Sequence, residues 1–390
     1  MLVPKLRFKR EDGTDFPEWE TRQLHNVFVE RNETQTIAED APLLSFTIEQ
    51  GVINPEDKKT NKRDFLIKDK DNKKYALTEY NDIIYNPANL KFGAIHRNKL
   101  GRGVVSPIYA IFHTGENPIF MEYIVTNPVF IKKSLKYLEG TVIKLMTLKP
   151  RDFLLMKCNI PCLEEQQKIA DFLSTVDEVI AQSEAEVQNL EQQKKAAMQK
   201  IFSQEVRFKR EDGTDYPEWE QYRLEDTVDF LDEKRKPITS KYRKAGQYPY
   251  YGASGIIDFI DDYIFDEELV LLSEDGANIV DRNYRVAFIA TGKYWVNNHA
   301  HCLRPKQGFA SYFISEALEN IDYTVYNTGS AQPKLNQEVC RNLPLMCPCL
   351  EEQQKIADFL SAYDESISYA KQELDKWKEL KKGLLQQMFV

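Results

Sequence analysis

Basic and amide side chains gather in one stretch of the first half of the chain, where residues 80–87 are predicted to form a strand entering a turn. Lysine and arginine contact phosphate, and amides and hydroxyls contact base edges, so a cationic loop of this kind suits a nucleic acid. The alternative is a solvated basic loop. The candidate contact residues in this stretch are Asn86, Lys91, Arg97, Lys99, Arg102 and Ser106.

A second group of candidates lies in the second half of the chain. Residues 234–236 are Lys-Arg-Lys, residues 248–255 (YPYYGASG) interleave aromatics with glycines, and residues 295–301 (WVNNHAH) bring amides and imidazoles together. Residues 328–336 (TGSAQPKLN) form a predicted polar turn. Asn and Gln read adenine edges, whereas Arg and Lys read guanine edges or phosphate. The candidates are Lys234, Arg235, Lys236, Tyr251, Ser254, Asn297, Asn298, His299, Gln332 and Lys334.

A zinc site is the competing interpretation of His299, His301 and Cys302. Structural zinc sites usually show two spaced ligand pairs, and no second pair accompanies these residues. The cysteine pairs at 158/162 and 347/349 also fail the usual zinc spacings. Cysteines that act as small buried hydrophobic side chains are favoured, so we predict no metal site.

Signatures of catalysis are missing from the sequence. Gly292-Lys293 lacks the upstream glycine and the following Ser or Thr of a phosphate-binding loop, and neither a G-x-S-x-G elbow nor a strand-placed G-x-G-x-x-G occurs. Residues 86–89 (NPAN) faintly resemble the Asn-Pro-Pro-aromatic motif of adenine methyltransferases, but the second proline and the aromatic are absent. We therefore predict no catalytic residue and no cofactor bound by this chain.

The elements that must position these candidates come from a duplication. Residues 7–20 (RFKREDGTDFPEWE) recur at 207–220 with Phe16 replaced by Tyr216, and residues 161–174 (PCLEEQQKIADFLS) recur unchanged at 348–361. Internal repeats of this kind indicate two tandem half-units. Residues 7–20 and 207–220 are called the frame segments below.

The segments between the repeated blocks show almost no similarity to each other. We call them the first insert (residues 21–160) and the second insert (residues 221–347), and both are predicted to be mixed α/β with short strands. The first insert carries a net charge of +5 and the second −4, within a chain of net charge −9. A basic surface suits phosphate, whereas the acidic second insert is expected to bind DNA weakly by itself.

Each copy of PCLEEQQKIADFLS opens a long predicted helix with a heptad seam. No Gly or Pro interrupts residues 163–202, and the acidic first turn suits a helix start. The first seam consists of Val176, Ile180, Ser183, Val187, Leu190, Lys194, Ala197 and Ile201. The second seam consists of Tyr363, Ile367, Ala370, Leu374, Trp377, Lys381, Leu384 and Met388.

These two seams predict an antiparallel two-helix coiled coil. A parallel, in-register pair would press Lys194 against Lys381. Antiparallel pairing places Lys194 opposite Ala370 and Lys381 opposite Ser183, where each lysine can extend to water. The alternative is two ordinary amphipathic helices, each packed on its own domain.

Composition sets the remaining limits. With 390 residues, of which 42% are hydrophobic and 29% charged, the chain is ordinary in composition and suits two or three domains. No apolar run approaches the roughly 18 residues of a membrane span, and the start lacks the apolar region of a signal peptide. Six cysteines fit a reducing compartment, so we expect a cytoplasmic protein without a membrane partner.

The combination of these features resembles the specificity subunits of type I restriction–modification systems. The resemblance covers essentially the whole chain and rests on the duplicated blocks, the long helices and the two dissimilar inserts; YGASGIID, WVNNHAH and TGSAQPKLN also resemble target-recognition domains. It implies an α+β fold with two α/β target-recognition domains separated by a long antiparallel coiled coil, as a pseudo-twofold tandem repeat. The expected divisions, alternately recognition domain and spacer helix, are residues 1–160, 161–206, 207–347 and 348–390.

The resemblance also implies a function. Each insert would read one half of a split, asymmetric site in double-stranded DNA, and the helices would set the gap between the halves. Two modification subunits, which hold S-adenosylmethionine and methylate adenine at N6, would dock on the half-units, and restriction subunits would join them. This chain itself would be no enzyme. The alternatives are a self-sufficient DNA methyltransferase or nuclease, and a coiled-coil scaffold whose inserts bind proteins.

Overall fold

The computed structural model describes residues 4–58, 73–139, 146–327, 329 and 333–389. The chain forms two compact units: unit 1 comprises residues 1–182 with 373–390, and unit 2 comprises residues 183–372. No helix within the described ranges is long and apolar enough to cross a membrane.

Unit 1 is built on a four-stranded antiparallel sheet with the strand order β2-β10-β7-β8. Its strands are β2 (Phe28–Glu30), β7 (Ile83–Tyr85), β8 (Ile95–Arg97) and β10 (Ala110–Thr114). All residues of the central strand β7 are buried, which is why it consists of consecutive apolar residues rather than an alternating pattern.

Three short helices follow the sheet of unit 1: α1 (Pro118–Thr126), α2 (Pro128–Ser134) and α3 (Pro150–Leu155). Asparagine caps fix two of the starts, because the Asn117 side chain accepts from the amides of Ile119 and Phe120, and the Asn127 side chain accepts from the amide of Val129.

The remaining strands of unit 1 form three smaller sheets. They are the pair β1 (Glu20–Gln23) and β11 (Lys157–Ile160), the sheet β3 (Thr34–Gln35), β6 (Tyr75–Thr78) and β9 (Gly103–Val105), and the hairpin β4 (Ser45–Thr47) and β5 (Gly51–Ile53).

Unit 2 contains a four-stranded antiparallel sheet with the order β13-β20-β17-β18. Its strands are β13 (Val228–Phe230), β17 (Leu269–Ser273), β18 (Ala287–Ala290) and β20 (Ala300–Pro305). A second four-stranded sheet has the order β15-β14-β19-β16, from β14 (Ala245–Gly252), β15 (Gly255–Ile260), β16 (Phe265–Asp266) and β19 (Lys293–Val296).

The strand pair β12 (Glu220–Arg223) and β21 (Pro344–Cys347) closes unit 2 as β1 and β11 close unit 1. The short helices of unit 2 are α5 (Leu224–Thr227), α6 (Asn278–Asp281), α7 (Ser311–Glu319) and α8 (Gln337–Arg341).

The two units share a plan that the dissimilar inserts did not predict. The sheets β2-β10-β7-β8 and β13-β20-β17-β18 have the same strand order relative to the chain. In both, the first strand along the chain pairs with the last, the last with the second, and the second with the third. A helix, α1 or α7, follows the last strand in both. The units differ in their other sheets, which are β3-β6-β9 and β4-β5 in unit 1 and β15-β14-β19-β16 in unit 2.

Both frame segments are anchored by the same contacts. Arg7 pairs with Glu165 at 2.7 Å, and the Trp19 indole donates to the same carboxylate at 3.2 Å. In unit 2, Arg207 pairs with Glu352 at 2.9 Å, and the Trp219 indole donates to it at 3.2 Å. Both carboxylates are fully buried, so each frame segment is tied to the first turn of the long helix that follows its insert.

Those long helices are α4 (Leu163–Phe202) and α9 (Leu350–Met388), which pack antiparallel as predicted. In unit 1, Lys381 of α9 pairs with Asp177 of α4, and in unit 2, Lys371 of α9 pairs with Glu191 of α4. Every predicted seam residue is buried or half-buried. The division at residues 160, 206 and 347 stays a prediction, because each compact unit contains parts of both helices.

The predicted surroundings of the seam lysines are wrong. Lys194 does not extend to water beside Ala370: its side chain is 8% exposed and its Nζ lies 2.7 Å from Asp364. Lys381 lies 2.5 Å from Asp177 and is 27% exposed. Each lysine meets a carboxylate about two turns from the expected small residue, because ion pairing offsets the cost of removing the ammonium from water.

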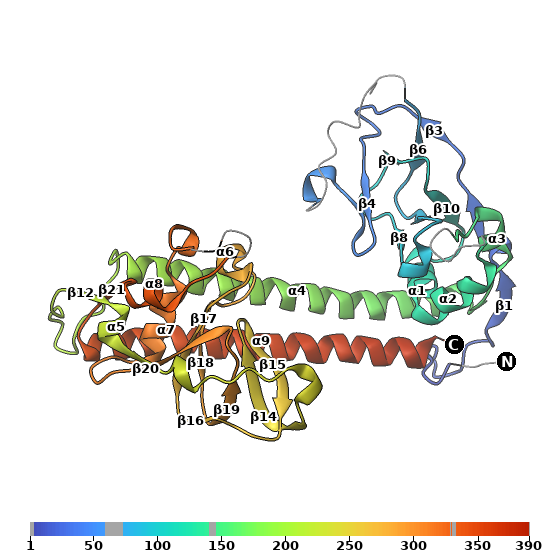
Figure 1. The fold of residues 1–390 in the computed structure, drawn as a ribbon. Coiled ribbons are helices and arrows are strands. Elements are labelled where there is room, and N and C mark those ends of the chain that lie inside the picture. Colours follow the sequence, from blue (N-terminus) through green and yellow to red (C-terminus); the bar gives the residue numbers. More distant parts are fainter. Residues whose placement is uncertain (1–3, 59–72, 140–145, 328, 330–332, 390) are drawn as a thin grey trace. The chain divides into compact units, whose positions relative to one another are not determined.

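The ends of the long helices complete the hydrophobic cores. Phe389, just beyond α9, is buried among the aromatic residues of unit 1, and Leu6 near the start of the chain donates its amide to Gln387 O at 3.1 Å. The segment around Leu6 and the end of α9 therefore lie side by side in unit 1 (Figure 1). Phe202, at the end of α4, packs in the same way against the core of unit 2.

Candidate nucleic-acid interface

Four loops of unit 2 that carry most of its candidates are bonded to one another. Ala253 O, in the turn between β14 and β15, accepts from the Ser273 hydroxyl at the end of β17. The Glu274 amide donates to His299 O at 2.9 Å, and the Leu335 amide donates to Glu274 O at 2.7 Å. The turns after β14, β17 and β19 and the segment before α8 therefore converge.

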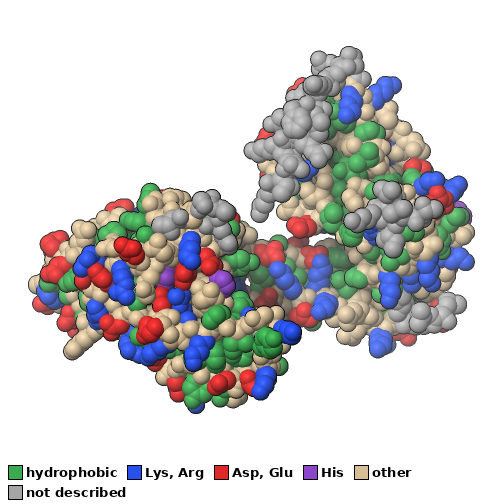
Figure 2. All heavy atoms as spheres, viewed as in Figure 1, with side chains coloured by type: hydrophobic (Ala, Val, Ile, Leu, Met, Phe, Trp, Pro, Cys, Tyr) green, Lys and Arg blue, Asp and Glu red, His purple; other side chains and the backbone are tan. Residues whose placement is uncertain are grey.

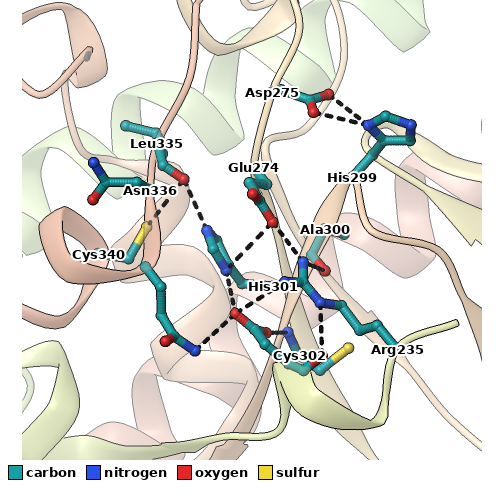
Figure 3. Close-up of polar contacts among 12 residues, drawn as sticks. Arg235, Glu274, Asp275, His299, Ala300, His301, Cys302, Leu335, Asn336 and Cys340 are labelled. Carbon is teal, nitrogen blue, oxygen red and sulfur yellow. Dashed lines mark hydrogen bonds and ion pairs between the residues drawn. The ribbon is translucent and has the colours of Figure 1, made fainter. Parts of the chain in front are cut away.

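A buried network around His301 lies at this convergence (Figure 3). His301 Nδ1 lies 2.6 Å from Asp232 Oδ2, and His301 Nε2 lies 2.9 Å from Leu335 O. Asp232 also accepts from the Cys302 amide at 2.9 Å and from the Gln337 side chain at 3.0 Å. Asp232 thus joins β20, α8 and its own segment.

The charges of this network favour an ion pair. Burial disfavours the charged form of His301, but the interactions with Asp232 and Cys340 together outweigh it and raise the pKa of His301 to about 10. For Asp232, burial opposes ionisation, yet the bond from His301 and the Cys302 amide lower its pKa. Both ring nitrogens of His301 face acceptors, which also requires the doubly protonated cation.

Arg235 belongs to the same network. Its guanidinium donates to Glu274 at 2.6 Å and to Ala300 O at 2.9 Å, and lies 3.4 Å from Asp232. The side chain is 13% exposed, so in this structure it bridges loops, whereas its neighbours Lys234 and Lys236 are exposed.

Four candidates of unit 2 are exposed at the converging loops: Ser254, Asn298, His299 and Lys334. His299 Nδ1 lies 2.8 Å from Asp275, which holds the ring in place. Lys334 Nζ lies 3.3 Å from Glu274. This part of unit 2 therefore presents a hydroxyl, an amide, an imidazole and an ammonium to solvent, a mixed set of donors and acceptors that suits base edges and phosphate.

Two other candidates of unit 2, Asn297 and Tyr251, are buried or half-buried and contact residues within the unit. Asn297 is buried, and its Oδ1 accepts from the His299 amide at 2.8 Å. Tyr251 is half-buried and its ring stacks on Phe288, with centroids 5.9 Å apart. Gln332 lies outside the described residues.

In unit 1, the predicted basic loop carries its own counter-ions. Arg97 is buried and pairs with Glu122 of α1 at 3.1 Å, and Lys99 pairs with the same carboxylate at 3.1 Å. Arg102, although exposed, pairs with Glu79 and Asp40. These carboxylates neutralise much of the positive charge that the sequence pattern indicated.

The three other candidates of unit 1 lie at turns. The side chain of Asn86 accepts from the Ala88 amide at 3.0 Å. Lys91, in the turn η4 (Leu90–Phe92), lies over the Phe92 ring at 5.2 Å. Ser106 is half-buried, and its carbonyl accepts from the Tyr109 amide at 3.2 Å.

A basic cluster that the sequence analysis missed lies on α2 and the adjoining turn η5 (Leu135–Tyr137). Lys132, Lys133 and Lys136 are exposed, and none of them forms an ion pair with another described residue. Figure 2 shows Lys and Arg side chains gathered on this part of unit 1. The signal was available, because the sequence Ile-Lys-Lys-Ser-Leu-Lys places three lysines at helical spacing without an acidic neighbour.

Over the described ranges, no group of three or more His, Cys, Asp or Glu side chains is placed to hold a metal ion. All six cysteines are free, and four of them are buried. Burial raises the pKa of Cys158 and of Cys347 to about 12, which leaves these thiols protonated at neutral pH.

Comparison with known sequences finds similarity to one family over part of the chain. Residues 216–378 match the family model for the type I restriction modification DNA specificity domain. A type I restriction enzyme specificity subunit assigned in Haemophilus influenzae is 32% identical over 139 residues, a match that spans 36% of each chain. The MjaX specificity subunit assigned in Methanocaldococcus jannaschii is 24% identical, over 97% of this chain and 94% of its own length.

Two solved structures share the fold. The S subunit of a type I restriction-modification system from M. genitalium aligns with a TM-score of 0.63 and 14% identity, covering 100% of this chain and 99% of its own. A chain from a study of complex assembly and conformational transition in a type I system aligns with a TM-score of 0.53 and 14% identity, over 96% of this chain and 98% of its own.

Proposed function

We propose that this chain is a specificity subunit of a type I restriction–modification system, like the proteins that it resembles, and that it directs such a system to a DNA target made of two separated half-sites. The duplicated architecture carries this proposal. Each unit repeats the same four-stranded sheet and frame contacts but adds different further sheets and loops. Two similar supports with different contact surfaces suit two different short sequences.

Within each unit, we assign the DNA contacts to the exposed members of the candidate set. In unit 2 these are Ser254, Asn298, His299 and Lys334, with Lys234 and Lys236 as phosphate contacts. In unit 1, Lys99, Arg102 and the lysine cluster of α2 supply the cations. Phosphate contacts position the protein and base-edge contacts specify the sequence.

A surface that occurs twice supports two partner subunits of the same kind. Leu163 and Phe172 on α4 are exposed, and their equivalents Leu350 and Phe359 on α9 are exposed as well; the two phenylalanines are 38% and 39% exposed. Large apolar side chains exposed at the same places in both repeats favour a partner that binds twice. We propose two modification subunits there.

The chemistry is proposed to lie in those partners. The modification subunits would hold S-adenosylmethionine and methylate adenine at N6, and restriction subunits would join the complex in the cytoplasm. This chain would supply recognition only.

The test is a map of N6-methyladenine in a methylation-free host that expresses this chain with its modification subunit. Two short half-sites around a fixed unread gap are expected, and replacement of residues 21–160 by the insert of a relative should change one half only. Methylation by this chain without the partner would contradict the proposal, and so would a contiguous target.

A further inference from the structure

A lysine in the heptad seam of unit 2 joins three elements. Lys194 of α4 lies 2.7 Å from both carboxylate oxygens of Asp364 on α9. The same Nζ lies 3.3 Å from Glu316 and 3.4 Å from the Tyr312 hydroxyl, both on α7. A single ammonium therefore links the two long helices to the helix that packs on the four-stranded sheet.

The other members of this cluster bond to one another. The Tyr312 hydroxyl donates to Asp364, and its ring centroid lies 5.8 Å from the Lys194 ammonium. Arg285, just before β18, pairs with Glu316. We call Lys194, Tyr312 and Asp364 the clamp of unit 2.

The clamp lies beside the apolar core of unit 2. Ala197 and Ile201 of α4, and Ile356 and Leu360 of α9, belong to the core of unit 2; Lys194 and Asp364 come one turn further along each helix. A cavity of about 620 Å³ lies beside them, lined among others by Lys194, Glu316 and Asp364. On the core side, α7 packs on the helix pair through apolar side chains such as Phe313, whose ring centroid lies 5.6 Å from that of Phe202. Beside the cavity, the contacts of α7 with the two helices are polar.

The same arrangement recurs in unit 1, although the inserts differ in sequence. Lys381 lies 2.5 Å from Asp177, and the Tyr123 hydroxyl donates to Asp177 at 2.6 Å. The Lys381 ammonium lies 5.6 Å from the Tyr123 ring centroid. Lys194 and Asp177 of the first repeat match Lys381 and Asp364 of the second, so each clamp takes one residue from each long helix and a tyrosine from α1 or α7.

We propose that the clamp of unit 2 is a positioning device that fixes the angle of the second recognition fold on the helix pair, and thereby the gap length that the subunit accepts between half-sites. This inference rests on the proposed function. One base pair adds about 3.4 Å and about 35° of twist, so a recognition fold must be held against small rocking motions to reject a gap that is one base pair too long or too short.

The test compares clamp variants in the assembled complex with the modification subunit. Plasmids carry the two mapped half-sites separated by the native gap and by one base pair more or fewer, and the fraction of methylated adenine is measured. Tyr312→Phe removes only the hydroxyl, and Lys194→Met removes the ammonium. In both variants, the ratio of methylation at the altered gaps to methylation at the native gap should be at least fivefold higher than in the unaltered chain. The bases read in each half-site should stay the same.

Lys371→Met is the matched control, because Lys371 pairs with Glu191 at 2.7 Å between the same two helices without touching α7. Its ratio should stay within twofold of the unaltered chain. If Tyr312→Phe leaves the ratio of altered-gap to native-gap methylation unchanged, the proposed role of the clamp is wrong. Methylation at the native gap would still support the proposed function in that case. Tyr312→Phe alone decides the question if Lys194→Met fails to fold. Absence of methylation by the unaltered complex would overturn both.

Discussion

The buried surroundings of His301 define the protonation state of its imidazole. Its two ring nitrogens lie 2.6 Å from an Asp232 oxygen and 2.9 Å from Leu335 O, and its side chain is 1% exposed. Breaking a buried ion pair by removing one partner costs about 3–5 kcal/mol. His301 therefore stabilises the convergence of loops that carries His299 and Lys334, without meeting a ligand itself.

The stability of unit 2 should consequently depend on pH in the alkaline range. The pKa of His301 is raised to about 10 in the folded chain, against roughly 6.5 when unfolded. Its contribution is thus fully present below about pH 6.5 and is lost as pH rises toward 10. Thermal unfolding midpoints measured from pH 6.5 to 10 should fall in the unaltered chain and fall less in His301→Gln.

His299→Gln provides the surface control for that measurement, because this side chain is 48% exposed. It should reproduce the pH profile of the unaltered chain. A His301→Gln profile as steep as that of the unaltered chain would contradict the assignment.

Single residues also show which contacts cannot be predicted from the sequence. The clusters around Arg97 and Arg235 were correctly identified as concentrations of charge, but their counter-ions lie far away in sequence: Glu122 is 25 residues from Arg97 and Glu274 is 39 residues from Arg235. Pairing of this kind depends on the tertiary fold. The partners of Lys194 and Lys381 did leave a signal, since Asp177 and Asp364 occupy matching positions of the repeated helices.

Among the elements, the long helices were predictable and the sheets were not. A heptad seam repeats within each helix, so local sequence defines the buried face of α4 and α9. The antiparallel direction was predicted because a parallel pair would press Lys194 against Lys381, although the expected surroundings of both lysines were wrong. The sheet order β2-β10-β7-β8 pairs strands that lie up to about 85 residues apart, for example Val29 with His113. No local pattern encodes such pairings, which is why the strand order common to both units was not predicted, although the pseudo-twofold repeat of two α/β domains was.

The lysine cluster on α2 leads to a prediction about salt. Replacement of Lys132, Lys133 and Lys136 by glutamine should weaken binding to DNA of any sequence, because phosphate contacts carry no sequence information. Each lost contact reduces the slope of log affinity against log salt by about 0.9, so the triple variant should lower it by up to about 2.7. Binding by the assembled complex at several salt concentrations measures the slope.

The corresponding control replaces Lys149 and Arg151, which pair with Glu139 at 2.5 and 2.7 Å. Their loss should change the slope less. A triple variant with an unaltered slope would place the DNA on another part of unit 1.

At the scale of the whole chain, the duplication allows the stability of each unit to be changed and measured separately. Phe389 contacts Trp19 and Phe120 in unit 1, with ring centroids 6.4 and 5.7 Å apart. Phe202 contacts Trp219 and Phe313 in unit 2, at 6.3 and 5.6 Å. Phe389, just beyond α9, is buried in the core of unit 1, and Phe202, the last residue of α4, is half-buried against the core of unit 2.

Phe389→Ala should therefore destabilise unit 1 by about 3–5 kcal/mol and leave unit 2 nearly unchanged, and Phe202→Ala should do the reverse. Amide hydrogen exchange in β7 reports on unit 1, and exchange in β17 reports on unit 2. Equal acceleration in both strands by either variant would mean that the units unfold together.

The contribution of residues 373–390 to unit 1 also bears on how the protein is made. A nascent chain emerges from the ribosome in sequence order, so residues 1–182 wait while the 190 residues of unit 2 are synthesised. At 5–20 residues per second this takes about 10–40 s. During that time the aromatic cluster around Trp19 and Phe120 has no Phe389 to cover it. The recognition unit that is translated first is thus the one that is completed last.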